Sequence, residues 1–439
     1  MRKKRAYRAS DVKKVVLAKV LESGPAGAVT VGLDVGKREV FAVVRWSDGT
    51  FERPWKVQNP SDIGTLVQLL RNMAGERPMI VAMESTGTYG DALRQALTDA
   101  ELDVQRVGGK AASDYAEIFD GVPSKHDGKD AAIVAELAAL GKSCPWAYRS
   151  KGKRDAEMAY WADWLDAQQS IQMLWIGRLE SLLARHWPEV TRLLDLTSVT
   201  LLRTLVHYGG PAKLAQDSAA TRRLVGWGRR PLKTAKIEKV LQSAKETIGV
   251  RQGAQDVKRI QQYAASALSA YRETQKARRK LERLAEGNEV IQRQAKAIGR
   301  ATACVLWVVL GDPRDYHCGN AYRKAMGLNL KERSSGKHKG RLKITKRGPS
   351  TVRRWLYFAA MRATQNPHVR RWYEAKKAKD GDRGKGALIG VARRLALALY
   401  GVAVRDEPFE AWRLFPGRSQ ARRSLQTRQG VTPVETAKA

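Results

Sequence analysis

Four acidic residues stand where the chain is expected to begin or end an element of secondary structure. Asp34 closes the segment VTVGLD, and Glu84 closes the nearly all-apolar segment PMIVAME. Asp127 and Asp130 lie three residues apart in KHDGKDAAIVAELAALGK, where they project from one face of an expected helix. Carboxylates at the ends of neighbouring strands, together with a pair on a packed helix, can converge on one point. Two divalent cations about 4 Å apart need such a set of hard oxygen ligands to clamp a scissile phosphate.

Each of these carboxylates also has a purely structural explanation. Asp127 could cap the helix, Asp130 could interact with the positive end of the helix dipole, and Asp34 could be a turn residue. Glu84 is more informative, because a carboxylate after an apolar strand is costly to place near a core without a cation. Together the four residues favour a metal site, for which Mg²⁺ is the expected ion and Mn²⁺ the alternative. His126, directly before Asp127, could contact this site or a substrate phosphate.

A second candidate for chemistry is the Ser-Ser-Gly sequence at 334–336, which lies in a strongly basic stretch. Such a tripeptide is ordinarily a flexible turn that contacts phosphate. The surrounding cations also suit a nucleophilic serine, because they can stabilise an attacked phosphate and a serine alkoxide. Residues 331–354 hold ten Lys and Arg against one Glu, which indicates a clamp on a nucleic-acid backbone. The expected nucleic-acid-binding residues are Arg333, Lys337, Lys339, Arg341, Lys343, Lys346, Arg347, Arg353 and Arg354.

An alternation of strands and helices is expected around the carboxylates. Residues 29–34 and 39–46 predict two strands with a tight connection, and residues 77–85 predict a third strand buried on both faces. Apolar residues recur at helical spacing over 62–74, and a further helix is expected over 127–141. This pattern predicts an α/β domain.

The rest of the chain is predicted to be mainly helical. The polar segment 254–290 predicts a protruding helix or coiled coil, although a helical bundle gives a similar pattern. Further on, RQAKAIGRAT predicts a short hairpin before a buried helix. The predicted organisation is a basic N-terminal extension (1–28), an α/β domain (29–145), a helical or coiled-coil dimerisation region (146–292), a mainly helical C-terminal domain with the serine loop (293–415) and a polar tail (416–439).

The charge balance predicts a polyanionic partner. The chain holds 80 Lys and Arg against 44 Asp and Glu, a formal net charge of +36 that nucleic acid would neutralise. Residues 31–140 are acidic, with 12 basic against 17 acidic residues, whereas residues 141–439 hold 60 against 25. Cations held between carboxylates and phosphates would explain this acidic module. The three cysteines fit a reducing cytoplasm, and no apolar run approaches the roughly 20 residues of a membrane span.

The order of the motifs GLDVGK, ESTGTYG and KHDGKDAAIVAEL resembles the RuvC-like domain of the DEDD insertion-sequence transposases, the bridge-RNA-guided recombinases. The resemblance continues, in the family's order, in AIGRATACVLWVVLGD, AYRKAMGLNLKERSSGK, ITKRGPSTVRRWLYFAAM and GKGALIGVARRLALALYGV. It covers most of the chain outside the helical middle and the two tails. The chain departs from the family in a glycine-poor hairpin and in Leu330, which stands where proline is common.

This resemblance implies a RuvC/RNase H-like N-terminal domain and a C-terminal transposase domain. The implied metal ligands are Asp34, Glu84, Asp127 and Asp130, and the implied nucleophile is Ser335, or Ser334 if the alignment shifts by one. A structured guide RNA would select donor and target DNA by base pairing. The enzyme would act in the prokaryotic cytoplasm, at the nucleoid, as a dimer that assembles into a tetramer. Two alternatives are a RuvC-like nuclease or junction resolvase without a covalent intermediate, and a catalytically silent nucleic-acid-binding scaffold.

Overall fold

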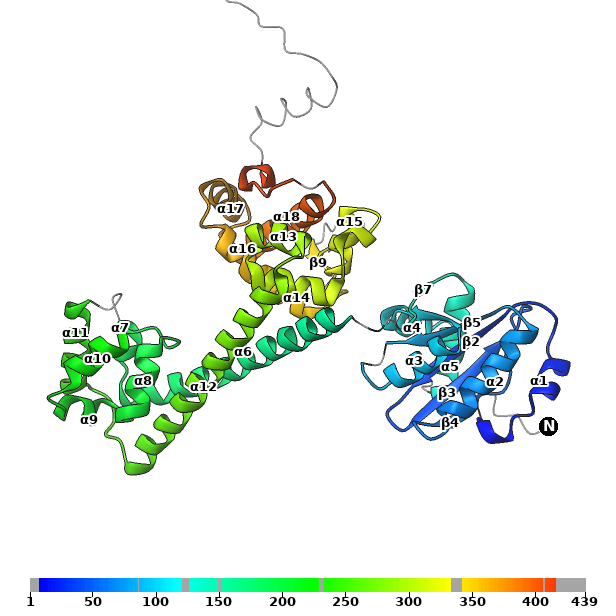
Figure 1. Cartoon of the computed structure of the whole chain (residues 1–439), viewed down its shortest axis with the longest axis horizontal. Helices are drawn as coiled ribbons and strands as arrows, with labels where there is room; N and C mark the ends of the chain where they lie inside the picture. The colour runs from blue at the N-terminus through cyan, green and yellow to red at the C-terminus, as the bar shows by residue number, and fades with distance from the viewer. Residues whose placement is uncertain are drawn as a thin grey trace, which may run out of the picture. The chain divides into compact units, whose positions relative to one another are not determined.

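The computed structural model describes residues 8–85, 87–120, 126–148, 150, 152–228, 233–332, 342–405 and 407–415 (Figure 1). The chain divides into two compact units after Ser150. The first unit is mixed α/β, and the described part of the second is mostly helical. This division agrees with the predicted fold class, an α/β domain followed by helical regions.

A mixed sheet forms the centre of the first unit. Its described strands number seven and follow the order β1-β4-β3-β2-β5-β6-β7, with β2 antiparallel to β3 and parallel to β5. The strands are β1 (Ser10–Asp11), β2 (Val29–Val35), β3 (Glu39–Arg45), β4 (Trp55–Gln58), β5 (Met79–Glu84), β6 (Asp103–Val107) and β7 (Ser143–Pro145). The α-helices are α1 (Leu17–Ser23), α2 (Ile63–Glu76), α3 (Asp91–Asp99), α4 (Gly109–Tyr115) and α5 (Asp127–Ala139).

The two faces of β2 contact different helices, because side chains alternate along a strand. Val31 and Leu33 are fully buried in the core that the sheet shares with α2 and α3. Gly32 and Asp34 therefore point to the opposite face, where α5 packs against the sheet. The strand pleat thus places the Asp34 carboxylate on the side of the sheet that carries α5.

Gly32 allows α5 to lie directly on β2. A Cβ atom at this position would stand 2.1 Å from the backbone oxygen of Ala131 and 2.5 Å from the backbone nitrogen of Ala135. Both distances are far below van der Waals contact, and backbone atoms cannot move aside as the end of a flexible side chain can. A glycine inside a strand often marks such a close approach of another backbone.

We predict that Gly32→Ala loosens α5, because the added methyl group must push the helix away from the sheet. The expected cost is about 1–3 kcal/mol of stability for the first unit, as for other overpacked cores. Hydrogen–deuterium exchange of the full chain should show faster exchange in peptides from α5. Gly64→Ala in α2 is the matched control, since an added Cβ there meets no described heavy atom within 4 Å. Unchanged exchange in α5 would contradict the close-packing account.

Residues 8–28, predicted only as part of a basic extension, are integrated into the first unit. β1 pairs with β4 in parallel, with Ser10 opposite Trp55, and Val12 is fully buried in the core of the sheet. The Arg77 guanidinium donates hydrogen bonds to the carbonyl oxygens of Leu21 at 2.9 Å and Gly24 at 3.2 Å. The described part of the extension is therefore an edge of the α/β unit.

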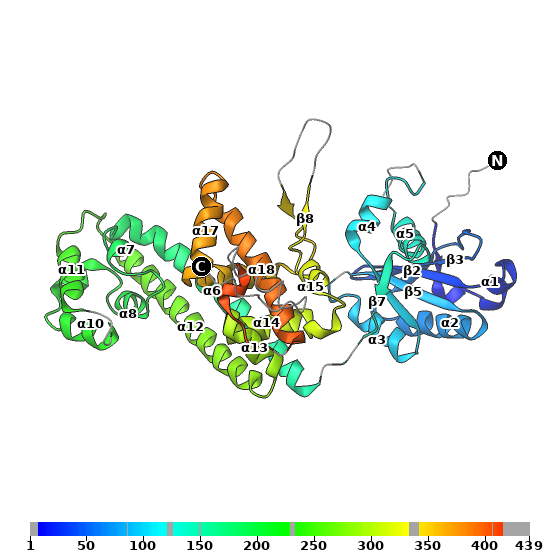
Figure 2. The same cartoon turned by 90° about the horizontal axis from the view of Figure 1, so that it is seen from above.

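Two long helices, α6 and α12, pack against each other in the second unit (Figures 1 and 2). The α-helices of this unit are α6 (Lys153–His186), α7 (Val190–Leu193), α8 (Val199–Tyr208), α9 (Pro211–Gln216), α10 (Ala220–Gly228), α11 (Thr234–Lys245), α12 (Ala254–Ala285), α13 (Glu289–Ile298), α14 (Arg300–Leu310), α15 (Gly319–Ala325), α16 (Ser350–Ala363), α17 (Pro367–Lys379) and α18 (Gly384–Val404). Two short strands, β8 (Leu330–Lys331) and β9 (Lys343–Ile344), pair with each other. The sequence permits a coiled coil or a bundle, and the structure pairs the two long helices within one chain.

The long helices connect two hydrophobic cores. At one end, α7 to α11 form a lobe whose core includes Trp187 and Leu205 (Figure 1). At the other end, Leu165 of α6 and Leu281 of α12 join the core of the C-terminal helices. The predicted boundary between 292 and 293 therefore does not separate two cores, because helices from both sides of it share one.

The predicted short hairpin around residue 299 is a turn between two helices. Gly299 ends α13 and precedes α14, with a φ of 83° that favours glycine over residues with a side chain. Further along, α18 is long and apolar enough to cross a membrane by length and composition alone. Leu395 and Leu399 of this helix are nevertheless fully buried against the other C-terminal helices. These contacts make α18 a core helix of the second unit.

Candidate metal centre and nucleic-acid-binding residues

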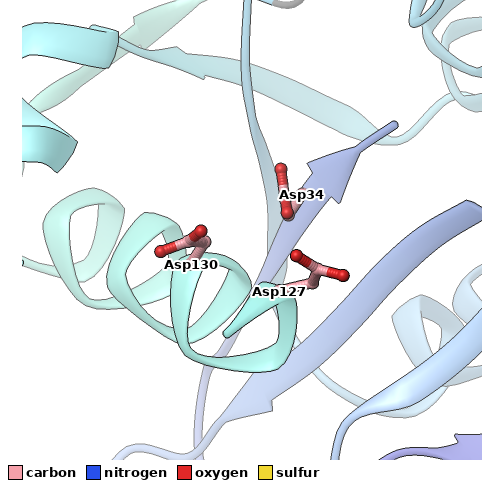
Figure 3. Close-up of side chains that lie close together, drawn as sticks. All are labelled: Asp34, Asp127 and Asp130. Carbon is pink, nitrogen blue, oxygen red and sulfur yellow. The ribbon is translucent and has the colours of Figure 1, made fainter. Parts of the chain in front are cut away.

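Three of the predicted metal ligands converge at one place in the first unit. Asp34 lies near the end of β2, and Asp127 and Asp130 lie in the first turn of α5 (Figure 3). Carboxylate oxygens of the three residues all lie within 4.8 Å of one another. Asp34 and Asp130 are half-buried, whereas Asp127 is exposed. The cluster is thus supported by the sheet on one side and remains accessible on the other.

The packing of α5 on β2 explains this convergence. Asp127, Ala131 and Ala135 follow one another at intervals of four residues and so share a face of the helix. Ala131 and Ala135 rest on Gly32, and Asp34 is the next residue of β2 on the same side. The contact that a glycine permits therefore brings the first turn of α5 next to the Asp34 carboxylate.

Glu84, the fourth predicted ligand, lies on the neighbouring strand. Leu33 of β2 pairs with Met83 of β5, so Asp34 and Glu84 occupy adjacent positions of two parallel strands. Met83 belongs to the core on the α2 face, which directs the Glu84 side chain to the α5 face. Its carboxylate packs closely over Gly109, where a Cβ would stand 2.2 Å from Oε1. Glu84 is half-buried and is not one of the three residues whose oxygens share the 4.8 Å cluster.

His126, not Asp127, supplies the cap of α5. The Nδ1 atom of His126 accepts a hydrogen bond from the backbone N–H of Gly128 at 3.2 Å, and Asp127 is the first residue of the helix proper. The alternative prediction that Asp127 caps the helix is therefore wrong. The Asp127 carboxylate instead lies at the positive end of the helix dipole, where negative charge is stabilised.

Two ion pairs that the sequence did not predict hold α5 in place. The ammonium group of Lys129 is almost fully buried and lies 2.6 Å from a carboxylate oxygen of Asp120. Glu136, two turns further along α5, pairs with Arg45 of β3, and both side chains are largely buried. Removing one partner of a buried pair typically costs about 3–5 kcal/mol, because the other charge is then left uncompensated. These pairs fix the position of α5, the helix that carries Asp127 and Asp130.

The cluster suits a divalent cation. Carboxylates this close repel one another when ionised, and a bound cation would relieve that repulsion. All the donor atoms are hard oxygens, which Mg²⁺ and Mn²⁺ prefer over the nitrogen and sulfur ligands of a zinc site. A bound ion of this kind could contact a substrate phosphate on the exposed side of Asp127.

The serine loop lies outside the described residues. The undescribed stretch 333–341 contains Ser334 and Ser335 together with the predicted phosphate ligands Arg333, Lys337, Lys339 and Arg341. On either side of it, β8 and β9 pair antiparallel, with Leu330 opposite Ile344. The described flanks of this stretch thus form a short β-ribbon, which the sequence did not predict.

The remaining predicted nucleic-acid-binding residues differ in exposure and in their contacts within the chain. Lys343, Lys346 and Arg347 are exposed around β9. Arg353 donates a hydrogen bond to the carbonyl oxygen of Gly348 at 2.5 Å, and Arg354 forms an ion pair with Asp166 of α6. Arg353 and Arg354 therefore also have intramolecular roles.

Comparison with known proteins identifies related sequences over most of the chain. Residues 31–160 match the IS110 DEDD family model described as Transposase, and residues 291–374 match the model of the Transposase IS116/IS110/IS902 family. The chain is also similar to the insertion element IS116 uncharacterized 44.8 kDa protein of Streptomyces clavuligerus. The two are 24% identical over 392 residues, which span 86% of this chain and 95% of that protein.

A solved structure of T. thermophilus RuvC in complex with a Holliday junction substrate matches 27% of this chain and 99% of the RuvC chain. The identity is 15% and the TM-score is 0.23. The acidic cluster lies within the segment matched by the DEDD model, and the β8–β9 ribbon lies within the second matched segment. The two family models thus match both places where the sequence predicted chemistry, and they relate this chain to the IS110/IS116 DEDD transposases, enzymes with nuclease-type catalysis.

Proposed function

We propose that this transposase cuts and rejoins donor and target DNA at a magnesium centre held by Asp34, Asp127 and Asp130, with Glu84 completing the ligand set. The convergence of the three aspartate oxygens within 4.8 Å is the observation that carries this proposal. Mg²⁺ bound there would neutralise charge on the scissile phosphate and orient it for in-line displacement. The register supports Glu84 as the fourth ligand, since it and Asp34 occupy adjacent positions of two parallel strands.

We propose that the nucleophile is the hydroxyl group of Ser335. In this step the serine Oγ forms a bond to phosphorus, and the bond from phosphorus to the 3′-oxygen breaks. The serine proton passes to a base, and the released 3′-oxygen takes up a proton. Attack by a 3′-hydroxyl on the phosphoserine reverses the step on another strand, so rejoining requires no external energy source. The basic residues that flank the serine support this assignment, because they can stabilise the pentacovalent phosphate.

A structured guide RNA is the proposed source of sequence specificity. The excess of positive charge over residues 141–439 suits backbone recognition of RNA and DNA duplexes, in which base pairing and not side chains would read the sequence. The enzyme would act at the nucleoid in the cytoplasm as a dimer assembling into a tetramer, with the helical middle joining the protomers. Sequencing of RNA that co-purifies with the protein, and analytical ultracentrifugation of the full chain, test these two points.

A RuvC-like nuclease or resolvase could use the same acidic cluster with water as the nucleophile. Covalent trapping separates the two functions. Suicide DNA substrates are incubated with the enzyme and Mg²⁺, and the products are resolved on denaturing gels with peptide mapping. A protein–DNA adduct supports the recombinase, whereas efficient cleavage without any adduct favours the nuclease. Absence of any metal-dependent cleavage would instead indicate a binding scaffold.

We predict that affinity for nucleic acid falls steeply with salt, approximately linearly on a log–log scale, because binding releases counterions from the phosphates. Neutralising Lys337, Lys339 and Arg341 together should reduce the slope by about 2–3, since each lost phosphate contact removes roughly one unit. Fluorescence anisotropy over a range of salt concentrations measures this slope. An affinity that does not depend on salt would refute the interpretation of the basic region.

A further inference from the structure

A cavity of about 570 Å³ lies in the second unit, and its described lining includes none of the residues assigned above to the metal centre or the serine step. Side chains of α6, α12 and α16 line it, together with Thr197 from the segment before α8 and Gln365 from the segment after α16. Two contacts join α6 to α16 beside the cavity. The Asp166 carboxylate of α6 forms an ion pair with Arg354, and it accepts a 3.0 Å hydrogen bond from the Trp355 indole. Its volume falls within the range of small-ligand sites, about 300–1,000 Å³.

The lining of this cavity favours an anion. It includes three arginines, Arg278, Arg354 and Arg362, and the described lining contains no aspartate or glutamate. Arg362 donates a hydrogen bond to the carbonyl oxygen of Ile298 at 2.8 Å. Burial lowers the pKa of the Arg362 guanidinium, and the nearby positive charge of Arg278 lowers it further. Within the described part of the chain, Arg278 has no hydrogen bond or ion pair. Arg278 is exposed, so its guanidinium is accessible to a phosphate group.

The same cavity offers surfaces for a flat, polar ring. Gln172 is 9% exposed, and among the described residues its amide has no hydrogen-bond partner. An amide presents one donor and one acceptor side by side, which matches the edge of a nucleobase. Phe358 and Met361 of α16 line the cavity while remaining 49% and 45% exposed. An exposed aromatic face of this kind is a stacking surface for bases.

We propose that this cavity binds one unpaired nucleotide of a nucleic-acid strand. The base stacks on Phe358, the Gln172 amide bonds to the base edge, and Arg278 contacts the phosphate. This inference rests on the proposed action on nucleic acid but not on the metal centre or the serine. It would give the protein a means of holding a base outside a helix, in addition to the backbone contacts predicted for the basic residues of 331–354.

Binding of short labelled oligonucleotides to the full chain, in buffer with EDTA, tests the proposal without any contribution from catalysis. Phe358→Ala should weaken binding of a single strand about tenfold, as the loss of stacking on one base does. Phe358→Tyr keeps an aromatic ring and should bind the single strand as the wild type does. Binding of a blunt duplex of the same length should change much less. Arg278→Gln should weaken single-strand binding as well. Parallel DNA, RNA and free nucleoside monophosphate probes distinguish the sources of the nucleotide.

Two matched controls accompany these variants. Arg279→Gln removes an exposed cation from the same helix, and Leu174→Ala removes an exposed apolar side chain from α6; neither residue lines the cavity. Thermal unfolding checks that each variant folds. Equal losses on single strand and duplex, or single-strand affinities of Phe358→Ala and Arg278→Gln that match their controls, would overturn the nucleotide site. Either result would leave the magnesium centre untouched, because that centre is tested by cleavage.

Discussion

Asp34→Asn is expected to abolish DNA strand cleavage and strand exchange while leaving nucleic-acid binding largely intact. An amide is nearly isosteric with a carboxylate but is a poor ligand for Mg²⁺, and losing the contribution of the metal costs several kcal/mol in the transition state. Because each 1.36 kcal/mol is a factor of ten in rate, the expected loss is at least about a thousandfold. Cleavage of labelled DNA under single-turnover conditions measures it, with anisotropy as the binding readout.

Asp99→Asn is the control for this experiment, because Asp99 is an exposed carboxylate at the end of α3 and has no assigned role. Glu84→Gln separates two versions of the site. A loss similar to that of Asp34→Asn assigns Glu84 to the ligand set, whereas near-normal cleavage would restrict the set to the three aspartates. Wild-type recombination by Asp34→Asn would show that the catalytic site has been misassigned.

The second large effect is expected from Ser335→Ala. This variant should fold and bind both RNA and DNA, yet it should form no covalent adduct and give no recombination. The reason is that the methyl group of alanine cannot form the bond to phosphorus that conserves the energy of the phosphodiester. Trapping with suicide substrates, followed by denaturing gels and peptide mapping, measures the adduct directly.

Ser334→Ala is the neighbouring control and should retain both the adduct and recombination. An adduct that persists in Ser335→Ala and disappears in Ser334→Ala would move the role by one residue. Efficient cleavage by the wild type without any adduct would eliminate the serine mechanism and leave a metal-dependent nuclease.

Much of the first unit could be predicted from local sequence patterns. β2, β3 and β5 each carry apolar runs long enough to identify, and α5 begins at the predicted Asp127. β1 has two residues and β7 has three, so neither is long enough to show alternation. Such edge strands form because a neighbouring strand pairs with them, as β4 does with β1. Local patterns therefore predict residues 8–28 only as part of an extension.

The candidate site was predictable in its residue types but not in its geometry. The spacing of Asp127 and Asp130 is a local signal, and Gly32 within a strand was an available sign of a close helix contact. The register that sets Glu84 beside Asp34 depends on pairing between strands that are distant in the sequence. The same is true of the Lys129–Asp120 and Arg45–Glu136 pairs, since only the packing of α5 decides which charges meet.

The most direct test of the magnesium centre is the position of a bound metal. Crystals of the full chain soaked with Mn²⁺ should give an anomalous difference peak bounded by the carboxylates of Asp34, Asp127 and Asp130. The peak should disappear in Asp127→Asn, together with metal-dependent cleavage. If a preparation that cleaves DNA with Mn²⁺ gives no peak at this cluster, or gives its peak elsewhere, the central account of catalysis is wrong.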